Sequence, residues 1–416
     1  MKEGWKKSHL IDVCTKITDG SHFSPKTITT GYPYITVRDV VEDNIDFVNC
    51  KHISKTDYND LVKNGCQPEK GDVLFSKDGT VGKVTVIDYE KEFVVLSSLA
   101  IIRPNKSIID SYFLSYILKS PFFLSEAIGR KTGVAIRRIV LKNLKTINIP
   151  LPPLPEQKRI VAIFDEAFAG IKKAIANTEK NLKNAQELYS NKLKFIFKKD
   201  GQGWQKSTIG ELCTLMTGGT PSKGKKQYFD GGKIPWLVSG DIHKQNIFEC
   251  DGRITQEGYD NSSAKYLPVN SVMIALNGQG KTRGTVAMLR MKATCNQSLV
   301  SINPNNSDKI LPEYIYTNLK IRYEDIRKIT GDSGNDRRGL NMPLIRKMSI
   351  TFPQSINDQK NIVDLEKQLS NKIYKFIEVQ QLKQQNLNEL KQSLLQKAFS
   401  SELTSNPDKS LKEAAV

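Results

Sequence analysis

The chain has 416 residues, with 62 Lys and Arg against 44 Asp and Glu, which gives a formal net charge of +18 and a sequence pI near 9.4. That balance favours a polyanionic partner, with nucleic acid as the first candidate, although a lysine-rich proteome would produce the same excess. There is no apolar run of about 18 residues, and the N-terminal stretch lacks the apolar segment of a signal peptide. We therefore exclude a membrane protein and expect a cytoplasmic one.

The first 150 residues alternate short β-branched or aromatic runs with turns rich in Gly, Asp and Asn. Runs at 33–37, 72–75, 83–87 and 93–102 predict strands, and Asp78-Gly79 predicts a tight turn between two of them. This pattern is typical of an α+β domain with a bent, mainly antiparallel sheet and a few helices.

A long helix is predicted next, because side chains suited to one seam recur at alternating spacings of three and four over about five heptads. The proline cluster from Pro150 to Pro155 places its start near Glu156, and the pattern ends near Lys198. At 1.5 Å per residue the helix is roughly 60 Å long and needs a partner of matching length. The predicted seam is Val161, Phe164, Phe168, Ile171, Ile175, Thr178, Leu182, Ala185, Tyr189, Lys192 and Ile196.

The second half repeats the first at an offset near 200 residues. Trp204-Gln-Lys-Ser matches Trp5-Lys-Lys-Ser, and the segment 270–278 matches 71–79 with Asn277-Gly278 in place of Asp78-Gly79. We therefore expect a second domain of the same α+β fold, followed by a second long helix.

That second helix is predicted from 357 to about 400, and its opening Gln359-Lys-Asn-Ile-Val363 repeats Gln157-Lys-Arg-Ile-Val161 at an offset of 202. A polar stretch at 380–385 interrupts its seam. Either helix alone could be an ordinary bundle helix, but two of equal length in one chain favour an antiparallel coiled coil with a pseudo-two-fold repeat. The predicted seam is Ile362, Leu369, Ile373, Phe376, Leu387, Leu390, Leu394 and Phe399.

The chain thus divides into four parts. We assign residues 1–150 to a first globular domain, 151–200 to the first long helix, 201–353 to a second globular domain, and 354–416 to the second helix with a polar tail.

The sequence contains no catalytic constellation. The six cysteines form no CxxC pair, and with four histidines they make no zinc pattern, so we read them as reduced thiols. The GKT in 277–282 lacks the glycine four residues earlier and the following helix that a P-loop needs, so a turn is the better interpretation. Motifs for a methyl donor, a flipped base or metal-assisted phosphodiester cleavage are also missing. We therefore predict no catalytic residue, no metal and no cofactor.

Basic residues gather in equivalent loops of both halves, beside the tight turns and before each terminal strand. Such side chains can bind phosphates or the edge of guanine, whereas the alternative for each is a solvated loop charge. The candidate DNA-binding residues are Lys77, Lys83, Arg130, Lys131, Arg137, Arg138, Lys225, Lys226, Lys281, Arg283, Arg337 and Arg338.

The segment from Ile149 to Ile160, IPLPPLPEQKRI, the Gly-Asp-Val-Leu-Phe-Ser run at 71–76, and the repeat of domain plus helix together resemble the specificity subunit of a Type I restriction-modification enzyme. The resemblance covers essentially the whole chain. It departs from the family at 352–359, where the proline cluster and the Glu of the first helix entry are absent.

The resemblance implies a non-catalytic subunit in which two target-recognition domains read a bipartite site on double-stranded DNA. It further implies a scaffold for two methyltransferase subunits and, through the complex, for endonuclease/translocase subunits. Two alternatives are a stand-alone DNA-binding or coiled-coil adaptor protein and, against the missing motifs, an enzyme in its own right.

Overall fold

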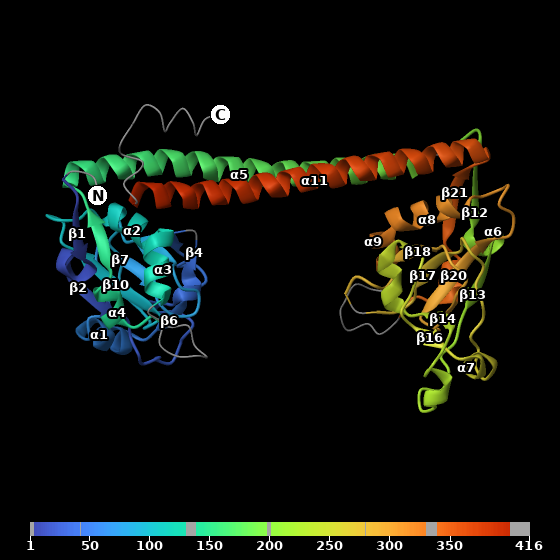
Figure 1. Cartoon of the computed structure of the whole chain (residues 1–416), viewed down its shortest axis with the longest axis horizontal. Coiled ribbons are helices and arrows are strands. Elements are labelled where there is room, and N and C mark those ends of the chain that lie inside the picture. Colours follow the sequence, from blue (N-terminus) through green and yellow to red (C-terminus); the bar gives the residue numbers. More distant parts are fainter. Residues whose placement is uncertain are drawn as a thin grey trace. The chain divides into compact units, whose positions relative to one another are not determined.

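The computed structural model describes residues 4–41, 43–129, 139–197, 201–278, 280–329 and 339–399. The chain forms two compact units (Figure 1). Unit 1 contains residues 1–179 and 381–416, and unit 2 contains residues 180–380. Each unit therefore combines one globular domain with one half of each long helix.

Unit 1 is built on a four-stranded antiparallel sheet with the order β2-β10-β7-β8. A second sheet, β6-β3-β9, has one antiparallel and one parallel pair, while β1 pairs with β11 and β4 with β5. The strands are β1 (Lys6–His9), β2 (Cys14–Asp19), β3 (Tyr32–Ile35), β4 (Val40–Val41), β5 (Asn44–Ile45), β6 (Lys51–Ile53), β7 (Val73–Ser76), β8 (Val84–Val86), β9 (Val94–Val95), β10 (Leu99–Pro104) and β11 (Asn148–Leu151).

Helices α2 and α3 pack between this sheet and the long helices, whereas α1 contacts β9 of the second sheet. Phe75 of β7 contacts Phe123 of α3 edge to face, and Phe113 of α2 contacts Phe399 in the same way. The short helices are α1 (Lys55–Lys63), α2 (Ser111–Lys119), α3 (Pro121–Gly129) and α4 (Leu141–Lys145).

Unit 2 repeats this plan. Its main sheet has the order β13-β20-β17-β18-β15, its second sheet the order β16-β14-β19, and β12 pairs with β21. The strands are β12 (Trp204–Thr208), β13 (Cys213–Thr217), β14 (Ile234–Leu237), β15 (Asn246–Ile247), β16 (Arg253–Ile254), β17 (Val272–Ala275), β18 (Val286–Leu289), β19 (Thr294–Cys295), β20 (Leu299–Pro304) and β21 (Ser349–Pro353). The short helices are α6 (Ile209–Leu212), α7 (Gln256–Asp260), α8 (Pro312–Ile321), α9 (Tyr323–Lys328) and α10 (Met342–Arg346). The α+β fold and the internal repeat are thus confirmed.

The long helices are α5 (Leu154–Phe197) and α11 (Ile356–Phe399), of 44 residues each. A buried glutamine anchors each of them to the domain before it. Gln157 donates to the carbonyls of Ile108 and Pro152 and accepts from the amide of Asp110, at 2.8–3.0 Å. Gln359 makes the same three bonds in unit 2, to Lys309, Pro353 and Leu311. Residues 202 positions apart at the two helix openings therefore match in structure as well as in sequence.

The two helices run antiparallel within each unit. In unit 1 the Phe164 ring lies 6.1 Å from that of Phe399, and Gln384 donates to Glu179 at 3.2 Å. In unit 2 the Tyr189 hydroxyl lies 3.0 Å from Glu366. Phe164, the earlier of the two α5 residues in unit 1, meets Phe399, the later of the two α11 residues, as opposite directions require. The antiparallel coiled coil is thus confirmed.

The structure places most of the predicted seam at buried or half-buried positions, with two corrections. Lys192 is exposed, and Leu193 is buried in its place. On α11, Phe376 is 37% exposed. After the anchoring Gln359, the next buried positions of α11 are Val363, Glu366 and Ser370. Val363 and Ser370 directly follow the predicted Ile362 and Leu369, which are half-buried.

The physical reason for this shift is a polar cluster that apolar periodicity does not detect. Glu366 accepts hydrogen bonds from Tyr189 and from Lys320 of α8, at 3.0 and 3.1 Å, and Ser370 also lies 3.2 Å from the Tyr189 hydroxyl. Because a buried carboxylate must be paired, this cluster fixes which face of α11 turns inward.

All six cysteines are free. Burial raises the pKa of Cys14, Cys213 and Cys295 to about 12, so these thiols stay protonated. Over the part of the chain that the structure describes, no His, Cys, Asp and Glu side chains cluster as a metal site. None of the helices described is both long and apolar enough to span a bilayer.

Candidate nucleic-acid interface

The tight turn between β7 and β8 in unit 1 is held by its own side chains. Ser76 Oγ donates to the Thr80 carbonyl at 2.6 Å and accepts from the Lys83 amide at 2.7 Å. Gly79 has a φ of +67°, a conformation that favours glycine. The predicted Asp-Gly turn is therefore present.

The two lysines of this turn, both candidate DNA contacts, are used inside the domain. Lys77 is fully buried, and its Nζ lies 3.0 Å from Asp19 Oδ1. Lys83 Nζ donates to the carbonyls of Val37 and Val40, at 3.1 and 2.6 Å. A phosphate contact by either ammonium would require breaking these bonds, so this geometry gives neither lysine a free charge for DNA.

The equivalent turn of unit 2 has basic side chains that are more accessible to solvent. Tyr323 and Arg327 of α9 hold its backbone, by donating to the carbonyls of Lys281 and Gly280 at 2.9 and 2.5 Å. The Lys281 side chain is exposed and that of Arg283 is half-buried. The chain then continues into β18 and not into a helix, as the turn interpretation of GKT predicts.

The structure does not describe the loops at 130–138 and 330–338. Six candidate residues therefore lie outside the described residues: Arg130, Lys131, Arg137, Arg138, Arg337 and Arg338. The first residues that follow these loops are placed, however. The Ile139 amide donates to the Lys77 carbonyl at 2.8 Å, and the Leu340 amide to the Leu276 carbonyl at 3.0 Å. Each loop thus ends beside the tight turn of its own domain.

Long loops follow β2 and β13, and each begins at a glycine that the fold requires. A Cβ on Gly20 would lie 2.3 Å from the Val95 carbonyl oxygen, and one on Gly218 1.7 Å from that of Cys295. No larger residue fits at either position. After these equivalent starting points the two loops differ in sequence.

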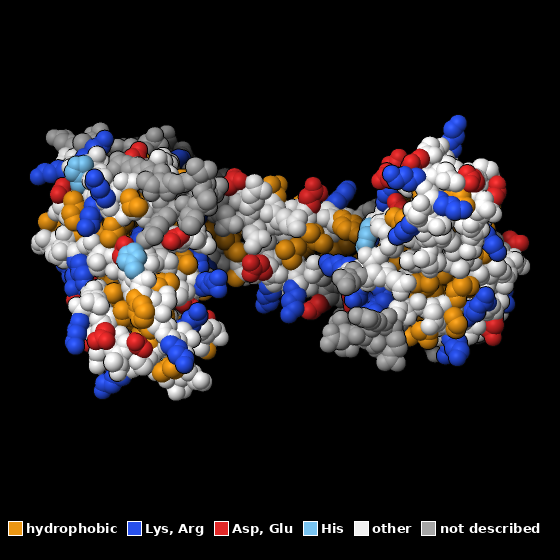
Figure 2. Space-filling view, turned by 90° about the horizontal axis from the view of Figure 1, so that it is seen from below, with side chains coloured by type: hydrophobic (Ala, Val, Ile, Leu, Met, Phe, Trp, Pro, Cys, Tyr) orange, Lys and Arg blue, Asp and Glu red, His pale blue; other side chains and the backbone are white. Residues whose placement is uncertain are grey.

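The loop of unit 2 is basic. Lys225 and Lys226 are both exposed, as is the neighbouring Lys223. Lys225 Nζ lies 3.0 Å from the Tyr228 hydroxyl, and this hydrogen bond raises the pKa of Lys225. A fixed, permanently charged ammonium in an exposed loop is suited to a phosphate contact. Lys and Arg side chains are visible on both units in Figure 2.

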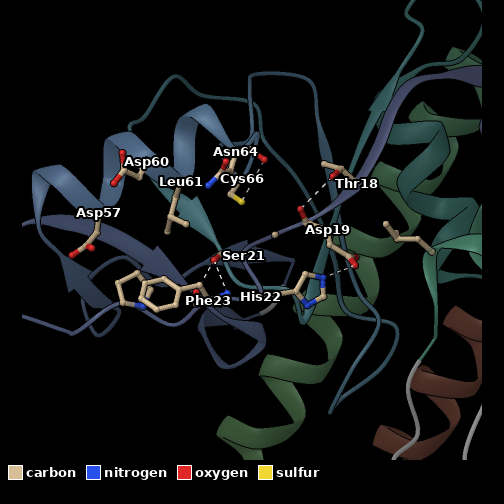
Figure 3. A pocket seen from close by; sticks show the side chains of 13 residues that line it. Thr18, Asp19, Ser21, His22, Phe23, Asp57, Asp60, Leu61, Asn64 and Cys66 are labelled. Carbon is tan, nitrogen blue, oxygen red and sulfur yellow. Dashed lines mark hydrogen bonds and ion pairs between the residues drawn. The ribbon is translucent and has the colours of Figure 1, made fainter.

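The loop of unit 1 instead borders a groove of about 610 Å³ (Figure 3). Asp19 is among the residues that line it, and its Oδ2 is 3.2 Å from His22 Nε2. Phe23 is 67% exposed at the rim, and Asp57 and Asp60 come from α1. No Lys or Arg is among the residues that line it, so the groove offers acceptors for base amino groups and an aromatic surface for stacking, and it would repel phosphate.

Sequence reasoning missed this groove because it searched for basic residues. The available signal was Ser21-His22-Phe23-Ser24, an aromatic residue inside a polar loop that starts at the repeated glycine.

Comparison with known proteins points to one family. The family model for the Type I restriction modification DNA specificity domain matches residues 2–183 and again residues 201–392. The specificity subunit of the Escherichia coli Type I restriction enzyme EcoR124I/EcoR124II is 26% identical over 299 residues, which is 70% of this chain and 71% of that protein.

Two solved structures share the fold at 19% identity. A chain from a study of complex assembly in the type I R-M system has a TM-score of 0.74 and covers 97% of this chain and 99% of its own. The HsdS subunit from Thermoanaerobacter tengcongensis has a TM-score of 0.61, with 97% and 98% covered. Because the family model matches both halves and most of the residues, the chain belongs to the family of Type I restriction modification DNA specificity domains.

Proposed function

We propose that this chain is the specificity subunit of a Type I restriction-modification enzyme, which reads a bipartite site on double-stranded DNA and scaffolds the enzyme's other subunits. The observation that carries the proposal is the duplication: two domains of one topology, each joined to a long helix by the same buried glutamine, with the family model matching both halves. A bipartite site needs two reading modules, and the repeat supplies them.

In this proposal residues 1–150 and 201–353 are the two target-recognition domains, and residues 151–200 and 354–416 connect them. The chain itself is non-catalytic. Methyltransferase subunits, two in number, supply methyl transfer, and endonuclease/translocase subunits join through the complex. Such a protein works in the cytoplasm, where it has access to DNA.

We assign phosphate contacts to the exposed Lys225, Lys226 and Lys281, and to the arginine loops that end beside the tight turns. Base reading by the first domain is assigned to the groove beside His22 and Phe23. Lys77 and Lys83 receive a structural role, because their ammonium groups are bonded inside the domain. A stand-alone DNA-binding or coiled-coil adaptor is not favoured, since the family match spans both halves.

The test is a domain exchange in the reconstituted complex. Residues 1–150 are replaced by the corresponding domain of a relative with a known site, and the methylated sequences are read from a randomised DNA library. One half-site should change while the other stays. The isolated chain should transfer no methyl group. Altered specificity at both halves, or at neither, would contradict independent modules.

A further inference from the structure

Lys77 occupies a core position of the first domain that a leucine fills in the second. Its amide donates to the Ser98 carbonyl at 3.0 Å. The Leu276 amide donates in the same way to the Ser298 carbonyl, at 2.8 Å, so the two positions are equivalent. Lys77 is fully buried and Leu276 is 9% exposed. The fold itself therefore has no need of a charge here, and a buried ammonium is costly unless it is paired.

The partner of this ammonium is also specific to the first domain. Lys77 Nζ lies 3.0 Å from Asp19 Oδ1, an oxygen that is shielded from solvent. Asp19 ends β2, and the residue that ends the equivalent β13 is Thr217. Replacing both members of a buried ion pair by uncharged residues is often neutral or stabilising. Stability alone therefore does not account for the ion pair of the first domain.

The other carboxylate oxygen of Asp19 holds His22. Asp19 Oδ2 lies 3.2 Å from His22 Nε2, as the dashed line in Figure 3 shows. The Lys77 ammonium requires a carboxylate beside it, and a carboxylate only accepts hydrogen bonds, so Nε2 carries the hydrogen of the neutral imidazole. His22 Nδ1 is then an acceptor. No described residue bonds to Nδ1, and the side chain is 62% exposed where it lines the groove.

This groove lies beside the other candidate DNA contacts of the first domain. Leu141 lines it too, two residues after Ile139, whose amide donates to the Lys77 carbonyl at 2.8 Å. The groove is therefore next to the tight turn and to the end of the arginine loop. Phe23, 67% exposed, adds an apolar surface of the kind that contacts the thymine methyl group.

We propose that His22 is a specificity-determining residue of the first domain. It accepts a hydrogen bond at Nδ1 from an amino group on the major-groove edge of one base, adenine N6 or cytosine N4. The inference rests on the proposed function. Lys77 and Asp19 are positioning residues that act through His22, because their ion pair keeps the hydrogen on Nε2. Guanine and thymine are disfavoured, since each presents an oxygen where the amino group would be.

The substitution Asp19→Asn should reverse this preference. The Lys77 ammonium can only donate, so the oxygen of the new amide faces it and the amide NH2 group faces His22. Nε2 must then accept, the hydrogen moves to Nδ1, and His22 donates toward the base. The preferred base should change from adenine to guanine or from cytosine to thymine, because each change replaces the amino group by an oxygen.

The experiment uses the full-length chain in its reconstituted complex with the methyltransferase subunits. The complex methylates a randomised DNA library in mildly alkaline buffer, where an imidazole is neutral. The methylated sequences give the base preference at each position of both half-sites and distinguish adenine from cytosine. In Asp19→Asn the preference at one position of the first half-site should shift about tenfold or more, while the second half-site stays unchanged.

Two further variants make the test specific. Asp60→Asn is the matched control, since Asp60 lines the same groove but its carboxylate lies 4.0 Å from Lys63 Nζ. The double variant Lys77→Leu with Asp19→Thr gives the first domain the residues of the second, and it decides the question if Asp19→Asn does not fold. The double variant should keep its thermal stability and lose the base preference at the same position, whereas a merely structural ion pair would leave that preference intact.

Four results overturn the inference and leave the proposed function standing. They are an unchanged base preference in folded Asp19→Asn, a retained preference in the folded double variant, the same reversal in Asp60→Asn, and a wild-type preference for guanine or thymine at the position that changes. If the wild-type complex methylates no bipartite site, the proposed function itself fails.

Discussion

Replacing Gln157 by Met should loosen the junction between the first globular domain and α5, because the side chain keeps its length but loses its polar atoms. Three hydrogen bonds disappear, to Ile108, Asp110 and Pro152, and the site is fully buried. At about 1 kcal/mol net for each bond, local opening should become easier by about 3 kcal/mol. That corresponds to roughly 100-fold faster exchange of the local amides.

Hydrogen exchange measured by mass spectrometry tests this locally, since two units need not unfold together. Peptides around Asp110 should exchange faster in Gln157→Met, while those around Leu311 in unit 2 stay unchanged. The equivalent Gln359→Met should show the reverse. Arg159→Met, an exposed change one half-turn further along α5, is the control. Unchanged exchange near Asp110 in a folded Gln157→Met protein would refute the anchoring role.

Three other substitutions probe the DNA-binding surfaces and the buried thiols. The double variant Lys225→Ala with Lys226→Ala should leave the recognised sequence unchanged. The slope of the logarithm of the DNA-binding constant against the logarithm of the salt concentration should fall in magnitude by about 0.9 for each phosphate that these lysines neutralise. An equal slope in the variant and the wild type argues against these contacts. Phe23→Ala should weaken binding by about 1–3 kcal/mol and relax the first half-site, as a competition assay with mutated sites would show, whereas uniform weakening would mean that Phe23 reads no base. Burial raises the pKa of Cys213 and Cys295 from 9.0 to about 12. The stability that these protonated thiols contribute is therefore complete below pH 9 and is lost as the pH rises toward 12, by about 1.4 kcal/mol per pH unit and thiol. Replacing both cysteines by Ala should flatten that decline in thermal unfolding curves recorded at increasing pH.

The sequence predicts the fold well where one physical signal dominates. The alternating spacing of Phe164, Phe168 and Ile171 identifies α5, and the repeated Gln157 and Gln359 identify the equivalent start of α11. Apolar periodicity then misplaces part of the second seam, because Phe376 and Leu369 look like core residues, whereas Glu366 and Ser370 point inward. Only the tertiary partners Tyr189 and Lys320 make a buried carboxylate acceptable there.

The candidate interface is harder to predict because charge does not reveal where a side chain points. Lys77 and Lys83 stand beside a turn just as Lys281 does, yet the first two are bonded within the domain and the third is exposed. The difference lies in residues distant in sequence, such as Asp19, which pairs with Lys77 in unit 1, whereas Thr217 at the equivalent end of β13 carries no carboxylate.

The central claim is that this chain determines which bipartite DNA site is modified. The most direct measurement is a profile of methylated bases across the host genome, with and without the gene. We expect one class of methylated site, two short half-sites with a fixed gap, which disappears when the gene is deleted and returns when it is restored. A methylation profile that is identical in both strains, while the methyltransferase subunit is produced, would contradict the account.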